Sequence, residues 1–365
     1  MRKPDYRRSI MNVSRSILKH YGAYEGDDTI PVLDQALKQG FNHVIFMLLD
    51  GLGTNVLKIH LPKTAFLRQH YRQTITSVFP STTVAATNAV LAAEPPVTTG
   101  YLGWVQYFKE EDKQIVVFLN EDYYTGEKAT VPFRQTYHAY PSLAARIRRQ
   151  QHDVVANEIF HGSIEGGSKT FDEHLARLDA RMKAHEKTMT YVYWTDPDMT
   201  EHTHGIHHEQ TGNVIRELDR KTALFAENMP DDALLIVIAD HGLIDVIAEP
   251  LYENQALLDC LIRPPSIEAR ATTFFVKSDC HEPFQRLFNK RYKHHFKLLT
   301  KGELYQLGLL GDGKMHPRLD EYLGEYIAIA TKNRMFMLQP GKPFLAHHAG
   351  LTKGELQVPL IIYHR

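Results

Sequence analysis

Short, almost uninterrupted apolar runs mark the strands that the sequence predicts. The four clearest runs cover residues 43–49, 191–194, 234–239 and 358–363, and they are rich in aliphatic and aromatic side chains. Continuous hydrophobicity, in place of the alternation of a half-exposed strand, is typical of a strand that helices cover on both faces. These runs therefore predict the central strands of a mostly parallel sheet.

Helical segments lie between these runs. Residues 84–94 are rich in alanine, and residues 142–151 and 172–186 carry charged side chains at helical spacing. Strands that alternate with helices predict an α/β fold with a doubly wound sheet and helices on both of its faces. The polar, histidine-rich residues 195–210 are expected to form a loop.

Residues 262–340 have a different pattern and predict a small inserted α+β cap. A strand is expected at 272–277, a basic helix at 284–295, and two further strands at 325–330 and 334–338. This cap interrupts the main sheet before its last strand. The predicted domains are a catalytic core, residues 1–261 and 341–365, and the cap, residues 262–340.

Composition and charge narrow the functional classes. The 365 residues are 43% apolar and 23% charged, with a formal net charge of −1, which argues against a broad surface for nucleic acid or anionic lipid. The two cysteines, Cys260 and Cys280, form no CxxC pattern and suit a reducing compartment. The basic N-terminal segment lacks the apolar stretch of a secretory signal, and no run is long enough to span a bilayer. We therefore expect a cytoplasmic enzyme or binding protein.

Aspartates follow three of the predicted strands at the point where each strand ends. Asp50 follows the first run, Asp198 lies just past the second, and Asp240 follows the third. Ligand sites of open α/β sheets form at the carboxyl ends of the strands, so these three acids are expected to converge. Taken singly, Asp-Gly and Asp-His-Gly after a strand are also typical of simple turns.

Histidines accompany these aspartates. His202 comes four residues after Asp198, which places both side chains on one side of a helical turn. His241 follows Asp240 directly, and His347 and His348 precede the last strand. Carboxylate and imidazole ligands without a thiolate suit Zn²⁺ or Mn²⁺ better than Mg²⁺. Three aspartates and three histidines, counting either His347 or His348, are enough for two ions, which in hydrolases lie about 3.5–4 Å apart.

A nucleophile is expected among the hydroxyl residues 81–83, directly before the alanine-rich helix. The free N–H groups at a helix N-terminus favour a phosphate, and an adjacent metal ion lowers the pKa of a hydroxyl group. Serine and threonine at such a position are also common N-caps.

These motifs, in this order, resemble the alkaline phosphatase superfamily, and most closely its type I phosphodiesterase/nucleotide pyrophosphatase family. The resemblance covers residues 41–250 and 344–363. Its five motifs are Asp50-Gly51, residues 79–83, Pro197-Asp198 with His202 and Gly205, Asp240-His241-Gly242, and His348-Ala349-Gly350-Leu351.

The resemblance implies an alkaline-phosphatase-like fold, two divalent cations and a covalent threonine intermediate. One cation would bind Asp50, Asp240, His241 and the nucleophile oxygen. The other would bind Asp198, His202 and His348. The implied reaction is in-line attack on phosphorus followed by hydrolysis of the enzyme-bound ester.

The resemblance also selects among neighbouring residues. Family members carry a small residue ten positions after the nucleophile, which assigns Thr83 with Ala93 and leaves Thr82 as the alternative. His348 matches the family's spacing better than His347.

Three residues depart from the family pattern, and one expected residue has no counterpart. Ala93 and Ala349 stand where family members usually carry glycine, and Glu201 replaces a small residue beside His202. We find no match for the asparagine that holds phosphate in nucleotide pyrophosphatases. The substrate class is therefore less well defined than the chemistry.

The function expected from the sequence is hydrolysis of phosphodiester or nucleotide pyrophosphate bonds, with a small phosphate ester or a nucleotide as the substrate. A phosphomonoesterase or phosphonate hydrolase of the same superfamily is the alternative, and an inactive metal-binding scaffold is the non-enzymatic one. The nucleophile signature of sulfatases, Cys- or Ser-x-Pro-x-Arg, is absent. No nucleic-acid partner is expected, because the basic run 290–295 is typical of a solvated helix face. No membrane partner is expected, because no apolar run is long enough to span a bilayer. Most aromatic residues between 101 and 140 are expected to pack, with stacking on a base as the alternative.

Overall fold

The computed structural model describes residues 2–365, and its largest sheets have six and seven strands. In spatial order the six-stranded sheet contains β2 (Tyr71–Thr76), β17 (Gln357–Tyr363), β8 (Ala233–Ile238), β1 (His43–Leu49), β7 (Thr188–Trp194) and β6 (Val155–Ile159). Strand β1 pairs in parallel with β7 and β8, and β6 pairs in parallel with β7. The predicted mostly parallel central sheet is confirmed.

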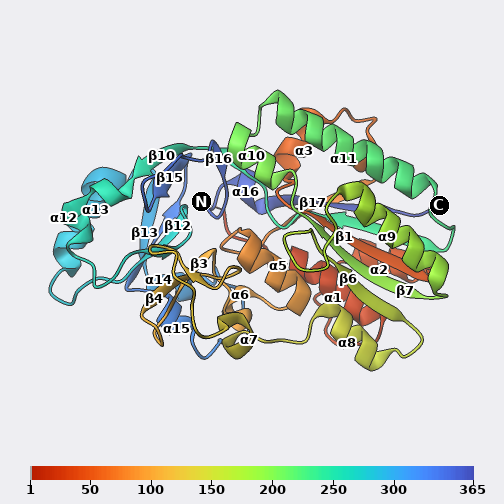
Figure 1. Ribbon diagram of the computed structural model, residues 1–365, viewed down its shortest axis with the longest axis horizontal. Coiled ribbons are helices and arrows are strands. Elements are labelled where there is room, and N and C mark those ends of the chain that lie inside the picture. Colours follow the sequence, from red (N-terminus) through yellow and green to blue (C-terminus); the bar gives the residue numbers. More distant parts are fainter. Residues whose placement is uncertain (1) are drawn as a thin grey trace.

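Helices cover both faces of this sheet, as predicted (Figure 1). On one face lie α1 (Ile10–His20), α5 (Thr83–Ala92) and α8 (Leu143–Gln150). On the other lie α3 (Thr54–His60), α9 (Phe171–Ala184) and α11 (Glu209–Glu227). The shorter helices α2 (Pro31–Leu37) and α4 (Phe66–Gln69) pack against α1 and α11 respectively.

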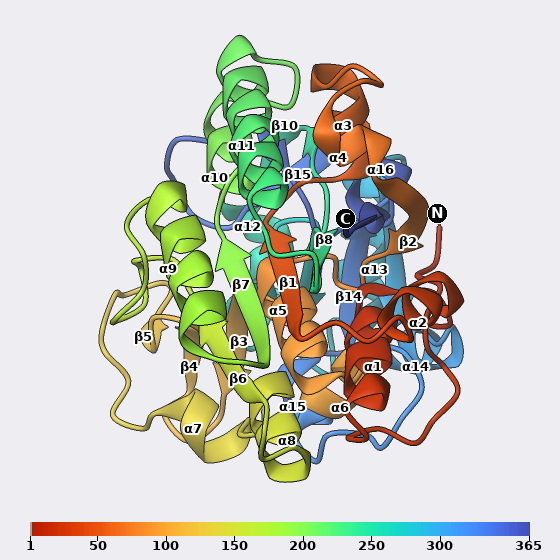
Figure 2. The same ribbon diagram turned by 90° about the vertical axis from the view of Figure 1, so that its right-hand side faces the viewer.

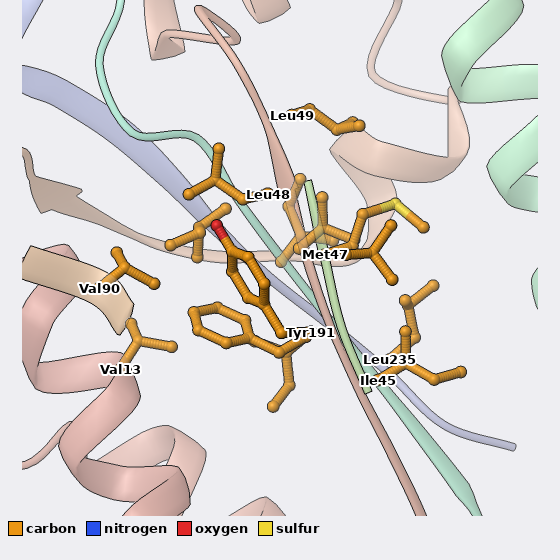
Figure 3. Close-up of a cluster of buried hydrophobic side chains, with 14 of the residues drawn as sticks. Val13, Ile45, Met47, Leu48, Leu49, Val90, Tyr191 and Leu235 are labelled. Carbon is orange, nitrogen blue, oxygen red and sulfur yellow. The ribbon is translucent and has the colours of Figure 1, made fainter. Parts of the chain in front are cut away.

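The main core lies between the sheet and its helices. All seven residues of β1 are buried. Figure 3 shows Leu48 on the side of the sheet that faces Val13 of α1 and Val90 of α5, whereas Met47 points to the other side. Successive side chains of a strand point to opposite faces, so a strand buried on both faces is expected to be apolar along nearly all of its length.

The second sheet forms the other half of the molecule, at the left of Figure 1. Its order is β13 (Phe296–Thr300), β14 (Tyr326–Ala330), β12 (Ala271–Phe274), β11 (Ser266–Ile267), β3 (Val105–Phe108), β4 (Lys113–Val116) and β5 (Glu121–Asp122). Phenylalanines of α13 (His281–Tyr292) pack against its strands. This sheet joins strands of the predicted cap to β3, β4 and β5, which the prediction assigns to the core. Because one sheet contains strands from both sides of residue 262, it does not mark a domain boundary there, and that boundary stays a prediction.

The remaining elements are short. Two pairs of strands form small sheets, namely β9 (Ile244–Asp245) with β16 (Ala346–His347) and β10 (Ile247–Pro250) with β15 (Arg334–Met337). The other helices are α6 (Pro96–Thr99), α7 (Phe133–Tyr137), α10 (Asp198–His204), η1 (Leu251–Glu253), α12 (Gln255–Leu258), α14 (Lys301–Gln306), α15 (Leu319–Tyr322) and α16 (Lys353–Leu356). Among residues 2–365, no helix combines the length and apolar character needed to cross a bilayer.

Two local predictions are corrected. Residues 195–210 are not a simple loop, because they contain α10 and the first two residues of α11. Helix α10 carries almost no apolar residues, so its sequence has no helical hydrophobic pattern. Strand β17 runs antiparallel to both of its neighbours. Its apolar sequence indicates burial on both faces but contains no information on direction.

Candidate metal centre and active site

The three aspartates that follow strands lie together at one edge of the main sheet. Figure 2 shows β1 and β7 pointing to the same end of the sheet, near α10. The backbone N–H of Asp198 donates to the carbonyl oxygen of Asp50 at 3.1 Å. The N–H of Gly51 donates to Asp240 Oδ1 at 3.2 Å. Three segments far apart in sequence are therefore joined by direct hydrogen bonds.

Gly51 is required where these segments meet. Its φ is +76°, and a Cβ atom added there would lie 2.8 Å from the Cα of Asp198. A side chain at this position would therefore separate the loop after β1 from the start of α10.

One group of ligands surrounds the hydroxyl of Thr83. His241 Nε2 lies 3.3 Å from Asp50 Oδ1 and 3.5 Å from Asp240 Oδ2. Thr83 Oγ1 lies 3.2 Å from His241 Nε2 and 3.4 Å from Asp50 Oδ2. These four residues are the set that the family resemblance implies for the first cation.

A second group adjoins the first. Asp198 Oδ1 lies 3.4 Å from His202 Nε2 and 3.8 Å from His348 Nε2. The Nδ1 atom of His202 lies 2.8 Å from the carbonyl oxygen of Ala346, which leaves Nε2 directed toward Asp198. The rings of His241 and His348 are 4.0 Å apart, so the two groups are in contact.

The donor atoms of both groups fit divalent cations. Asp50 Oδ1, Asp198 Oδ1 and Asp240 Oδ2 are buried and have no hydrogen-bond partner among the described residues. Two sets lie within ligand distance of one another: Asp50 with Asp240 and His241, and Asp198 with His241 and His348. Buried carboxylates without a counter-charge are unfavourable, and bound cations supply that charge.

Burial is the main cause of the shifted pKa values in this cluster. Burial, and then the nearby Asp240 and Asp198 carboxylates, raise the pKa of Asp50 well above its usual range. Burial raises the pKa of Asp198 to about 8 and lowers that of His202 to about 4. Burial alone thus disfavours both carboxylate ions and imidazolium ions here. Neutral imidazoles are the form that binds metal ions.

The two candidate nucleophiles have different surroundings. Thr83 is the first residue of α5 and lies in the first ligand group. Thr82 is the preceding N-cap residue, and its hydroxyl donates to Glu268 Oε1 at 2.6 Å. Thr83 is therefore the hydroxyl beside the candidate metal ligands.

His347 and His348 both lie near the second group. His348 Nε2 is the atom close to Asp198, whereas His347 Nδ1 accepts from the backbone N–H of His348 at 2.8 Å. The ring of His347 lies 5.0 Å from that of His202. His347 is thus a neighbour of the cluster, and His348 is better placed as a ligand.

The three departures from the family pattern have distinct surroundings. Ala93 and Ala349 have φ values of +56° and +83°, in the left-handed region that glycine adopts most readily. Glu201 is fully buried, and neither carboxylate oxygen has a hydrogen-bond partner among residues 2–365. Burial, and then Asp198, Asp245 and Asp196, raise its pKa well above the usual range.

A cavity of about 500 Å³ opens beside the ligand groups. Its walls are mostly apolar and include Trp104, Tyr123 and Phe344. These are the aromatic side chains best placed to contact a bound molecule. Tyr107 and Phe108, two aromatic residues of the same sequence region, are instead buried in packing contacts.

Two residues of the site have no signal in the sequence. The Tyr193 hydroxyl donates to Asp50 Oδ2, and Glu268 lines the cavity with its pKa raised by burial to about 7. Tyr193 lies within the apolar strand β7, where a half-buried tyrosine is ordinary. Glu268 lies between strands β11 and β12 of the second sheet, whose approach to the active site is set only by the tertiary fold.

Comparisons with known proteins show the family and the fold of the chain. The model of the type I phosphodiesterase/nucleotide pyrophosphatase family matches residues 44–262. Murine ectonucleotide pyrophosphatase/phosphodiesterase 5 is similar in structure, with a TM-score of 0.64, 14% identity and 88% coverage of each chain. The human enzyme of that name has a TM-score of 0.63, 15% identity and 88% coverage of each chain.

An inactive variant of the murine enzyme in complex with AMP is also similar, with a TM-score of 0.63 and 14% identity over 87% of each chain. At these identities the solved structures establish a shared fold. No curated protein matches the sequence significantly.

Proposed function

Because the chain belongs to the type I phosphodiesterase/nucleotide pyrophosphatase family and is a hydrolase of that type, we propose the following mechanism and substrates for it. The proposed reaction is hydrolysis of phosphodiester or nucleotide pyrophosphate bonds through a covalent intermediate on Thr83. The observation that carries the proposal is the meeting of Asp50, Asp240 and His241 at the Thr83 hydroxyl.

We propose that the site holds two divalent cations, Zn²⁺ by preference and Mn²⁺ as the alternative. Asp50, Asp240, His241 and the Thr83 oxygen would hold one cation. Asp198, His202 and His348 would hold the other. When bound, such ions stabilise negative charge on the attacking, leaving and non-bridging oxygens. The buried oxygens without hydrogen-bond partners support this assignment.

In the proposed reaction, Thr83 Oγ1 forms a bond to phosphorus while the bond to the leaving oxygen breaks. Asp50 Oδ2 lies 3.4 Å from Thr83 Oγ1 and is placed to accept the hydroxyl proton. The N-terminus of α5 directs its free N–H groups toward the phosphoryl group. Water then attacks phosphorus, and the released Thr83 oxygen takes a proton.

The cavity supports a substrate with an apolar or aromatic part. Trp104 and Tyr123 offer faces on which a nucleobase can stack, and the murine relative binds AMP. We therefore propose small phosphodiesters or nucleotides as substrates. A phosphomonoesterase or phosphonate hydrolase is the second candidate, because the same ligand set serves all three reactions. The cytoplasmic location stays a prediction.

A turnover panel tests this proposal. Bis-p-nitrophenyl phosphate, p-nitrophenyl phosphate, dinucleotides, nucleotide sugars and a phosphonate ester would be assayed with Zn²⁺ and with Mn²⁺. We expect turnover of diesters or pyrophosphates to exceed that of monoesters. Absence of turnover on every substrate, with both metals bound, would show that the chain is an inactive scaffold.

A further inference from the structure

Glu268 is a buried acid in the cavity wall that the proposed reaction does not use. It lies between β11 and β12 and is 6% exposed. Its Oε1 atom accepts from the Thr82 hydroxyl at 2.6 Å and from the backbone N–H of Trp104 at 2.8 Å. No hydrogen bond is made to Oε2 within residues 2–365. Oε2 is therefore the oxygen of Glu268 that can interact with a molecule in the cavity.

The backbone around Glu268 is tightly held. Its N–H donates to the carbonyl oxygen of Ala271 at 3.1 Å, and its own carbonyl accepts from the Thr272 hydroxyl at 2.5 Å. A Cβ atom on Gly103 would lie 2.7 Å from the carbonyl oxygen of Ile267 and 3.0 Å from Glu268 Cγ. Glycine at 103 thus allows the second sheet to place this carboxylate against the start of α5.

The strained backbone of Ile267, the residue before Glu268, indicates that the surrounding structure holds Glu268 in a fixed position. Ile267 has a φ of +78°, which a β-branched residue rarely adopts. Such a conformation is unfavourable and persists where the surroundings impose it, often at functional sites. The chain therefore maintains an unfavourable backbone conformation directly beside Glu268.

The charges around the cavity show what this carboxylate would meet. Besides Asp198, which is a proposed cation ligand, Glu268 is the one acidic side chain in the described wall, and Lys342 is the one lysine or arginine. Glu268 accepts a hydrogen bond from the Thr82 hydroxyl, and Thr82 directly precedes Thr83 in the chain. A phosphoryl group at Thr83 would therefore lie near a negative charge that the proposed cations do not coordinate.

We propose that Glu268 is a specificity-determining residue that selects phosphodiesters over phosphomonoesters by repelling a second negative charge. A phosphodiester carries one negative charge, whereas a monoester carries close to two above about pH 6. Like charges at close range in a water-poor site repel each other strongly. This inference rests on the proposed function, because it requires the phosphoryl group to bind at Thr83.

The test compares kcat/KM for bis-p-nitrophenyl phosphate and p-nitrophenyl phosphate at about pH 8.5, where the monoester is a dianion. In Glu268→Gln, the diester-to-monoester ratio is expected to fall about tenfold or more, mainly through faster monoester turnover. Inorganic phosphate is expected to inhibit this variant more strongly, by about the same factor. Glu268→Asp keeps the charge and is expected to keep most of the preference.

Two further variants make the test decisive. Ala269→Lys adds a positive charge in the cavity wall without removing Glu268, and it is expected to lower the ratio even if Glu268→Gln fails to fold. Glu253→Gln removes an exposed carboxylate outside the cavity and is expected to leave the ratio unchanged.

The outcomes separate this inference from the function on which it rests. Equal losses on both substrates in Glu268→Gln, with an unchanged ratio in Ala269→Lys, would overturn the charge filter and indicate a structural role. A wild-type preference for the monoester would also overturn it. If the wild-type protein turned over neither substrate, the proposed function would fail and the inference with it.

Discussion

The two threonines at the start of α5 differ in what their hydroxyl groups contact. Thr83 lies beside His241, and Thr82 donates to Glu268. Thr83→Ala is expected to lower kcat/KM for bis-p-nitrophenyl phosphate about 10⁴-fold or more, because it removes the attacking oxygen. The measurement is steady-state turnover, with bound metal quantified in the same samples.

Thr82→Val provides the matched control for this prediction. It removes the neighbouring hydroxyl, and its effect on diester turnover is expected to stay within about tenfold, the scale of one hydrogen bond. If Thr82→Val were inactive while Thr83→Ala kept near wild-type turnover, Thr82 would be the nucleophile.

At the scale of elements, a buried ion pair joins the second sheet to the loop that carries His348. Arg270, just before β12, donates to both oxygens of Glu355 in α16 at 2.7 and 2.9 Å, and neither side chain is exposed. Glu355 also accepts from the backbone N–H of Gly350. Glu355→Gln is expected to lower the free energy of unfolding by about 3 kcal/mol or more, since it leaves Arg270 charged and unpaired.

Urea denaturation checks this prediction against an exposed pair. Asp179→Asn breaks the contact between Lys183 and Asp179, whose side chains are 75% and 44% exposed, and should change the unfolding free energy by less than about 0.5 kcal/mol. Equal effects of the two substitutions would show that the buried pair does not stabilise the junction.

The sequence predicts best those elements that are buried on all sides, because burial leaves a clear apolar pattern in the sequence. Residues 43–49 form β1 with the predicted bounds, because a strand covered on both faces must be apolar. Strand β2 is polar and mostly half-exposed, so it has no comparable pattern. The mixed composition of the second sheet, with strands from 105–122 beside strands from 266–330, depends on long-range contacts that no local pattern encodes.

The acidic site residues that the sequence predicts are those that follow strands. Asp50, Asp198 and Asp240 follow strands, and the carboxyl ends of parallel strands meet at one edge. Glu268 and Tyr193 reach the site only through tertiary packing, and no motif marks them. The spacing in the family predicts Thr83 over Thr82, and the contacts of Thr83 with His241 and Asp50 support that prediction.

For the whole molecule, the metal centre is expected to contribute to stability as well as to turnover. Elemental analysis of the wild-type protein is expected to give two divalent cations per chain. His241→Ala or Asp240→Asn should retain one. A chelator should abolish turnover and lower the melting temperature, because the cations bind only the folded state. A single ion in the intact wild-type protein would contradict the assignment.

Buried His138 gives the fold a specific acid sensitivity. Its ring nitrogens lie 3.1 Å from the carbonyl oxygen of Thr99 and 2.8 Å from the Tyr322 hydroxyl. Burial lowers its pKa from 6.5 to about 3. Between these values the unfolded chain binds a proton that the folded chain does not, so the free energy of unfolding falls as the pH drops.

His138→Gln removes this titrating group. From about pH 6.5 to 4.5, the fall in unfolding free energy should be shallower in this variant than in the wild type, by up to about 1.4 kcal/mol per pH unit. Urea denaturation at several pH values measures both slopes. Identical slopes would show that the folded protein takes up a proton at His138 as readily as the unfolded chain.

The most direct test of the central proposal is the identity of the residue that becomes covalently modified during turnover. The protein would be loaded with Zn²⁺, mixed with bis-p-nitrophenyl phosphate, quenched in acid and digested for peptide mass spectrometry. We expect a p-nitrophenyl phosphoryl adduct on Thr83 in the wild-type protein and no adduct in Thr83→Ala. Rapid diester turnover with the adduct on another residue, or with Thr83→Ala fully active, would contradict the proposed mechanism.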